Sequence, residues 1–144
     1  MFKKILYPTD FSDISKKALA YIKLLKEAGT KEVVVLHVID ERQIEAITLY
    51  GRGDSCEFIN KMEKEAEREI ALIEKELENI GFTVKPIIEV GIPLREILRV
   101  EEDEGVSAII LGSHGKTNIK EVFLGSVSEK VIRRSKNPVL VIKR

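Results

Sequence analysis

The sequence predicts an α/β fold in which a single, doubly wound parallel sheet of five strands carries helices on both faces. Apolar runs rich in valine and isoleucine alternate with amphipathic stretches along the chain, as in repeated strand–helix units. The run at 106–111 is apolar apart from Ser107, which is typical of a strand buried on both faces. The 144 residues match the length of one ordinary domain, so residues 1–144 are expected to form a single unit.

The first part of the chain contains two predicted strands with a helix between them. Residues 4–7 form the first strand, which Pro8 ends, and residues 32–39 form a second, β-branched strand. Ser12 can cap the intervening helix, and Gly29 follows it as a stop signal. One apolar face of that helix is expected to contain Ile14, Ala18, Tyr21 and Leu25, which repeat at three- and four-residue spacing.

The middle of the chain contains a segment without a period, followed by a long helix. The segment from Asp40 to Ser55 is interpreted as a loop over or beside a ligand site, or equally as a loop without a role. The helix has one apolar face, made of Ile59, Met62, Ala66, Ile70, Ile73, Leu77 and Ile80. About three heptads could support a coiled coil, but packing on the sheet is the favoured interpretation.

The last part of the chain contains three predicted strands and two short helices. Residues 84–90 form the third strand, and Pro86 places it at a sheet edge because proline cannot donate to the ladder. Helices are expected at 93–103 and 126–134, and strands at 106–111 and 138–142. Right-handed crossovers and an edge third strand suit the strand order 3-2-1-4-5. In that order the chain reverses between strands 1 and 4, where open α/β sheets bind ligands.

Composition and charge exclude several classes of function. Twenty-four basic and twenty-four acidic residues give a formal net charge of zero, so nothing favours nucleic acid or a membrane surface. No apolar run approaches the roughly 20 residues that span a bilayer, and the N-terminus enters a strand without a secretion signal. We therefore expect a cytoplasmic protein. Cys56 is the single cysteine, which excludes an intrachain disulfide and disfavours redox chemistry.

Glycines gather at the junction between the fourth strand and the last helix. Gly112 and Gly115 follow the strand, and Gly125 comes directly before the helix at Ser126. Glycine lets a backbone approach a ligand closely, and the first amides of a helix have no partner within it. The junction therefore predicts a phosphate-binding loop in which the amides of residues 126–128 face the anion.

Two better-known phosphate loops do not fit this chain. The run Gly115-Lys116-Thr117 is similar to the end of a P-loop, but that pattern requires glycine where Ile110 stands. The dinucleotide-binding fingerprint also fails, because Gly51-Arg52-Gly53 lacks the third glycine and follows no clear strand. The junction is therefore a phosphate loop of a different kind.

The chain resembles the universal stress protein family, and within it the ATP-binding branch. That branch carries two glycines separated by two residues, and then, after nine further residues, a glycine followed by serine or threonine. Here these are Gly112, Gly115, Gly125 and Ser126. The resemblance covers the full length of the chain. Further matching segments are Ile5-Leu6-Tyr7-Pro8-Thr9-Asp10-Phe11-Ser12, Leu36-His37-Val38 and Asn137-Pro138-Val139-Leu140-Val141-Ile142.

The resemblance implies a site for ATP. Pro8, Thr9 and Asp10 line its adenosine end, where the Asp10 carboxylate accepts from ribose hydroxyls, although Asp10 could also cap the next helix. Val38 offers backbone groups and an apolar wall to adenine. The residues implied to hold the ribose and phosphates are Gly112, Ser113, His114, Gly115, Lys116, Thr117, Asn118, Gly125, Ser126, Val127 and Ser128.

Several positions in this site have an open role or depart from the family pattern. Lys116 stands where arginine is frequent, and Asn118 stands where glycine is frequent, although asparagine tolerates a left-handed backbone. His114 is a candidate general base or phosphate contact, or equally a structural residue, and His37 is interpreted as a core histidine with satisfied hydrogen bonds. Mg²⁺ or Mn²⁺ would arrive bound to the triphosphate, because no Asp/Glu cluster offers a dedicated metal site.

These observations favour a regulatory module that binds ATP and acts as a switch on an unidentified protein partner. The alternatives are a slow ATP hydrolase or phosphoryl transferase, and a dimeric scaffold with a vestigial pocket. No catalytic motif surrounds His114 or Glu121, so no catalytic residue is assigned and turnover is expected to be weak or partner-dependent. The apolar segment from Pro138 to Ile142 predicts an unprotected edge strand and a homodimer through it, as the resemblance also implies.

Overall fold

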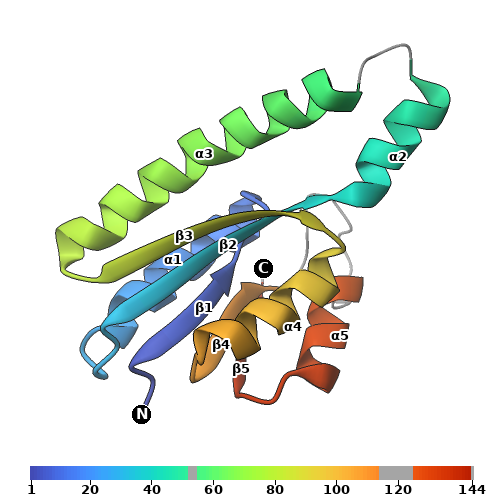
Figure 1. The fold of residues 1–144 in the computed structure, drawn as a ribbon. Coiled ribbons are helices and arrows are strands. Elements are labelled where there is room, and N and C mark those ends of the chain that lie inside the picture. Colours follow the sequence, from blue (N-terminus) through green and yellow to red (C-terminus); the bar gives the residue numbers. More distant parts are fainter. Residues whose placement is uncertain (52–54, 114–124, 144) are drawn as a thin grey trace.

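The computed structural model describes residues 1–51, 55–113 and 125–143, and it confirms the predicted fold class. Five parallel strands form one sheet in the order β3-β2-β1-β4-β5 (Figure 1). The strands are β1 (Lys4–Pro8), β2 (Glu32–Asp40), β3 (Thr83–Gly91), β4 (Ala108–Gly112) and β5 (Val139–Ile142). The helices are α1 (Asp13–Leu25), α2 (Glu41–Tyr50), α3 (Ser55–Ile80), α4 (Pro93–Glu104) and α5 (Ser126–Arg134). The edge position of β3, which contains Pro86, is as predicted.

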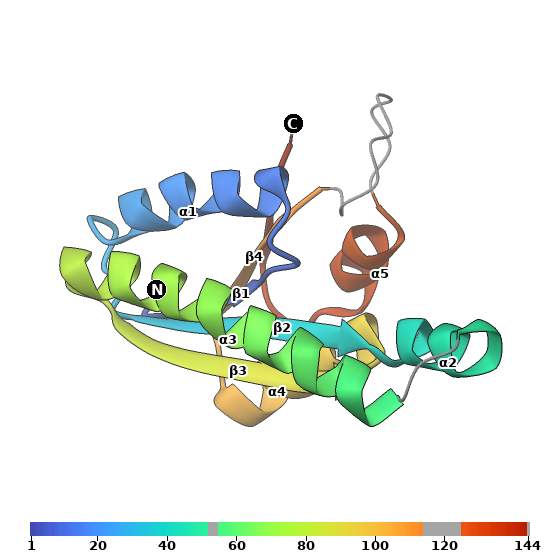
Figure 2. The same ribbon diagram turned by 90° about the horizontal axis from the view of Figure 1, so that it is seen from above.

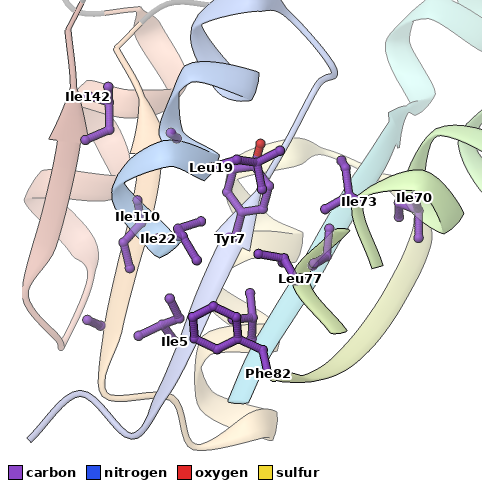
Figure 3. Packing of buried hydrophobic residues seen from close by; sticks show 14 residues of the cluster. Ile5, Tyr7, Leu19, Ile22, Ile70, Ile73, Leu77, Phe82, Ile110 and Ile142 are labelled. Carbon is purple, nitrogen blue, oxygen red and sulfur yellow. The ribbon is translucent and has the colours of Figure 1, made fainter. Parts of the chain in front are cut away.

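The sheet is buried between two helical layers, which can be followed in Figures 1 and 2. Successive residues of β1 point to opposite layers: Ile5 and Tyr7 pack with α1 and α3, whereas Leu6 packs with α4 and α5. Figure 3 shows the first of these clusters, in which Leu19 and Ile22 of α1 meet the strands. Burial on both faces explains why the strands are apolar nearly throughout their length.

Helix α1 begins as predicted, but its buried face differs from the predicted one. Ser12 is its N-cap and accepts a hydrogen bond from the Ser15 amide. Tyr21, expected on the apolar face, is 42% exposed, and Leu19 and Ile22 are buried instead. The spacing of Tyr21 from Ala18 and Leu25 fits one face of a helix, but the residues that pack on the sheet belong to the neighbouring row. Spacing alone did not distinguish these two adjacent rows.

The prediction of a loop from Asp40 to Ser55 is wrong, because most of this segment is helix α2. Asp40 caps this helix: its Oδ1 accepts from the Arg42 amide at 3.0 Å, and the Arg42 guanidinium binds both carboxylate oxygens. That hydrogen-bonded guanidinium lowers the pKa of Asp40. Ile44 and Ile47 are half-buried where α2 lies beside α3. The other apolar residues Ala46 and Leu49 are exposed, so the sequence shows no clear apolar face, and only the cap and the neighbouring helix reveal the element.

Helix α3 spans 26 residues and packs along the sheet, as favoured over a coiled coil. Its buried residues are Ala66, Ile70, Ile73 and Leu77, which all belong to the predicted face. The remaining surface carries alternating glutamate and lysine. Among the residues that the structure describes, neither this helix nor any other is long and apolar enough to cross a membrane.

Candidate functional site

A cleft of about 880 Å³ opens at the carboxyl ends of β1, β2 and β4. It lies at the point where the strand order reverses between β1 and β4, which is where open α/β sheets place their ligands. The predicted site residues that line it are Pro8, Thr9, Asp10, Val38, Gly112, Gly125, Ser126, Val127 and Ser128. Residues far apart in the sequence, predicted from two unrelated motifs, therefore meet in one cleft.

Ser113 is the one predicted site residue that is described but does not line this cleft. Ser113 is buried just behind it, where its amide donates to the Ile142 carbonyl at 2.8 Å and its carbonyl accepts from the Gly125 amide at 2.6 Å. These two bonds connect the end of β4 to β5 and to the start of α5. His114, Gly115, Lys116, Thr117 and Asn118 lie outside the described residues.

A tight turn after β1 carries Asp10 into the cleft. Thr9 Oγ1 accepts from the Phe11 amide at 3.0 Å, and Asp10 Oδ1 accepts from the Ser12 amide at 2.9 Å. Phe11 has a φ of 63°, a left-handed conformation that costs a non-glycine residue about 1–2 kcal/mol. Since Ser12 is the cap of α1, Asp10 is not the cap. Its bond to Ser12 instead fixes the orientation of its carboxylate.

Buried hydroxyls support this turn from below. Thr9 Oγ1 also accepts from Ser15 Oγ at 2.6 Å, and the Tyr7 hydroxyl donates to the Ser15 carbonyl at 2.5 Å. Burial raises the pKa of Tyr7, so its phenol stays protonated and remains a donor at neutral pH. The three side chains join β1 to the first turn of α1 and make a rigid floor under the cleft.

His37 and Phe11 form an aromatic part of the cleft wall that the sequence did not reveal. Their rings stack with centroids 4.3 Å apart and planes at 25°. His37 Nδ1 lies 2.8 Å from the Thr9 carbonyl, and because a carbonyl only accepts, Nδ1 must carry a proton. The prediction of a satisfied core histidine is correct for this hydrogen bond. His37 is only half-buried, however, and it lines the cleft.

The start of α5 forms another wall of the cleft, in which the first amides of the helix have no acceptor within it. The first hydrogen bond within this helix joins the Glu129 amide to the Gly125 carbonyl, so the amides of Ser126, Val127 and Ser128 precede it and have no acceptor within the helix. The helix dipole adds partial positive charge at the same place. The Ser128 hydroxyl donates to the Gly112 carbonyl at 2.9 Å, so this side chain joins α5 to β4.

Gly112 is required by its surroundings. A Cβ built at this position would lie 2.8 Å from Ile14 Cγ2 and 3.2 Å from the Ser15 amide nitrogen. Gly112 therefore lets β4 approach the start of α1, and this close approach brings the α5 wall toward the turn after β1. Gly112 lines the cleft, and its predicted role at a ligand stays a prediction; the packing of β4 on α1 is a second reason for glycine at this position.

The charges around the cleft are mostly acidic within the described residues. The acidic residues that line it are Asp10, Asp40, Glu65 and Glu69. Among the described lining residues, Arg68 is the only lysine or arginine. Two of the acids are paired, Asp40 with Arg42 and Glu69 with Lys16 at 3.7 Å. In the described part of the chain, no group of three or more His, Cys, Asp or Glu residues could hold a metal ion. Residues of α3 were missed because its predicted role was packing alone.

Comparisons with known proteins identify the family. The model of the universal stress protein family matches residues 1–143. Universal stress protein MJ0577 of Methanocaldococcus jannaschii is 51% identical over 100% of this chain and 96% of its own, and YxiE of Bacillus subtilis is 38% identical over 99% and 100%. A solved structure of MJ0577 covers the whole chain at 53% identity with a TM-score of 0.91, over 97% of that protein. The chain therefore belongs to the universal stress protein family.

Proposed function

We propose that the protein binds ATP in this cleft and acts as a nucleotide-dependent regulatory module. The observation that carries the proposal is the pairing of two opposed walls at the switch point: a carboxylate held by its own turn, and the open amides of a helix N-terminus. Sugar hydroxyls are donors that a carboxylate accepts, and phosphates are acceptors that helix amides bind. A nucleotide carries both groups, because its ribose has hydroxyls and its phosphates extend away from the ribose.

The adenosine end of the ligand would lie against β1 and β2. Pro8 and Val38 provide apolar surface there, and the Asp10 carboxylate is oriented by the Ser12 amide to accept from the ribose. The phosphates would extend toward the amides of residues 126–128. Mg²⁺ or Mn²⁺ would arrive on the triphosphate, and it would also screen the phosphates from the acidic side chains around the cleft.

A regulatory role is favoured over catalysis. Hydrolysis needs a residue that orients a water molecule at the terminal phosphate. Within the described residues the only cleft-lining histidine is His37, and its stack on Phe11 and bond to Thr9 tie it to the β1 side, away from the amides of α5. We therefore expect sustained phosphate release below about 1 s⁻¹ at saturating ATP and Mg²⁺, the low end of ordinary enzyme rates. A faster rate would favour the hydrolase or phosphoryl transferase.

Calorimetric titration of the protein with ATP and Mg²⁺ tests the binding proposal. In Asp10→Asn the amide oxygen can still accept from Ser12, but a carboxylate oxygen is lost, so affinity should fall roughly 10- to 100-fold. Gly125→Val adds bulk at the phosphate end, and the backbone angles of Gly125 (φ −60°, ψ 156°) suit valine, so binding should be lost without unfolding. Asp13→Asn, an exposed change in the first turn of α1, is the matched control. Equal affinities in all four proteins would refute the site.

We also propose that the protein is a homodimer paired through β5. This strand lies at a sheet edge, and its four residues Val139–Ile142 are all apolar. Edge strands usually avoid such exposure, because open backbone groups recruit another strand. Antiparallel pairing with a second copy would satisfy those groups and close the assembly as a two-fold dimer. Sedimentation at micromolar concentration tests this, and a monomer would refute it.

A further inference from the structure

The backbone of β5 shows which of its groups are open to a second chain. The carbonyls of Pro138 and Ile142 accept from the amides of Ile109 and Ser113, at 3.0 and 2.8 Å, on the β4 side. In a strand, the N–H and C=O groups of alternate residues point the same way. Residues 138, 140 and 142 therefore face β4, whereas the N–H and C=O groups of Val139 and Val141 face the open edge.

A buried carboxylate closes this open row at its start. Asn137 continues the outward row, but its amide already donates within the chain, to Glu101 Oε1 and to Ser135 Oγ, both at 3.1 Å. Glu101 is 4% exposed, and the same oxygen also accepts from Ser135 Oγ, the Lys136 amide and Asn137 Nδ2. We call this arrangement of Glu101 with residues 135–137 the Glu101 latch. The backbone amide of Asn137 is therefore already satisfied within the chain.

The other end of the row also lies outside the strand. Lys143 follows the last residue of β5, and its carbonyl accepts from Lys17 Nζ at 3.2 Å. Two residues, Val139 and Val141, are thus left with outward backbone groups inside the strand. Together they offer two donors and two acceptors to a partner.

We propose that the Glu101 latch sets the register of self-pairing, so that Leu140 faces Leu140 of the partner subunit on the two-fold axis. This inference rests on the proposed dimer. In this register Val139 pairs with Val141 of the partner subunit and Val141 with the partner subunit's Val139. Each pair exchanges two hydrogen bonds, so all the open groups are used.

The two neighbouring registers leave some of the open backbone groups of β5 without a partner inside the strand. A register centred on Val139 would set Asn137 opposite Val141 of the partner subunit, and the latch already occupies the amide of Asn137. A register centred on Val141 would set Val139 opposite the partner subunit's Lys143, beyond the end of the strand. Leu140, by contrast, is 43% exposed, and an apolar side chain gains from burial against its own copy.

Disulfide trapping reads the register directly. Each variant is made in a Cys56→Ser background, since Cys56 is exposed. Directly opposite residues have Cα atoms about 4.5–5.5 Å apart, within disulfide range, whereas the two copies of residue 139 would lie about 8 Å apart in the proposed register. Mild oxidation of the dimer should therefore cross-link Leu140→Cys, but not Val139→Cys or Val141→Cys. Cross-linking through residue 139 or 141 instead would overturn the register.

Removing the Glu101 latch should change which cysteine variants form a cross-link. Glu101→Ala frees the Asn137 amide and makes the Val139-centred register available, so Val139→Cys should begin to cross-link at the expense of Leu140→Cys. Ser135→Ala, a milder change that removes one of the two acceptors of the Asn137 amide, should shift the cross-linking pattern in the same direction, and it keeps the test available if Glu101→Ala does not fold. Glu102→Ala, next to the latch but largely exposed, should change nothing.

The outcomes separate the two proposals. A wild type that sediments as a monomer removes the dimer itself. If the wild type is a dimer and the folded latch variants keep its cross-linking pattern, the role of Glu101 is refuted and the proposed dimer is not. Merely lower stability in Glu101→Ala, without a change of register, counts against the inference too.

Discussion

The wall of the cleft at residues 8–15 is held by side-chain hydrogen bonds, whereas the wall formed by Gly112 and the start of α5 is held mainly by close backbone approach. In the first, which we call the β1 wall, the hydroxyls of Thr9, Ser15 and Tyr7 fix a left-handed turn at Phe11. In the second, the α5 wall, the absence of a side chain at Gly112 lets β4 contact α1. Substitutions should therefore damage the two walls in different ways: by removing polar partners in one, and by adding atoms in the other.

The largest expected effect is in the α5 wall. Gly112→Val should cost about 3 kcal/mol of unfolding free energy, because its Cβ would collide with Ile14 and with the backbone of Ser15. Urea unfolding measures this. The matched control is Gly105→Ala at the end of α4, where φ is +59° but nothing lies within 4 Å of an added Cβ. That change should cost only about 1 kcal/mol, from backbone strain alone. Equal losses would mean that small shifts of Ile14 and its neighbours relieve the collision, so that close approach does not require glycine at position 112.

An intermediate effect is expected in the β1 wall. Thr9→Val keeps the shape but leaves the Phe11 amide and the Ser15 hydroxyl without their acceptor, so unfolding free energy should fall by about 2 kcal/mol. ATP affinity should fall with it, since the turn orients Asp10. Thr48→Val on α2, which removes an exposed bond to the Ile44 carbonyl, is the control and should cost much less. A variant with normal stability and normal affinity would show that the turn is held by something other than Thr9.

The smallest effect should be at Asp40, which belongs to neither wall and begins α2. Asp40→Asn keeps an oxygen that can cap the helix but removes the charge that pairs with Arg42. Because the folded-state pKa of Asp40 is lowered, its charged form stabilises the fold above the unfolded pKa, and this stability is lost as pH falls through the folded-state pKa. Wild type should therefore be slightly more stable than the variant at pH 7 and equal to it at about pH 2. A difference that persists in acid would assign the effect to the cap.

Local pattern was enough wherever an element is buried along its whole length or marked by a special residue. The apolar runs became strands, Pro86 lies on an edge strand, and the apolar face of α3 packs as expected. The cleft also follows from local signals, because a strand order with one reversal brings the turn after β1 beside the glycine junction. Helix α2 was missed because its apolar residues do not form one clear face and its stability depends on a cap and on α3.

The sequence by itself therefore determined the fold, the place of the cleft and most of the residues on its β1 and α5 walls. Burial and backbone preference depend on residues that are close together in the sequence, so local patterns reveal them. The tertiary structure decided the rest: the stack of Phe11 on His37, the collision that requires Gly112, and the four hydrogen bonds that Glu101 accepts from residues 135–137. Each of these joins groups that are distant along the chain. No period or motif encodes such contacts, because they exist only after the sheet has brought their elements together.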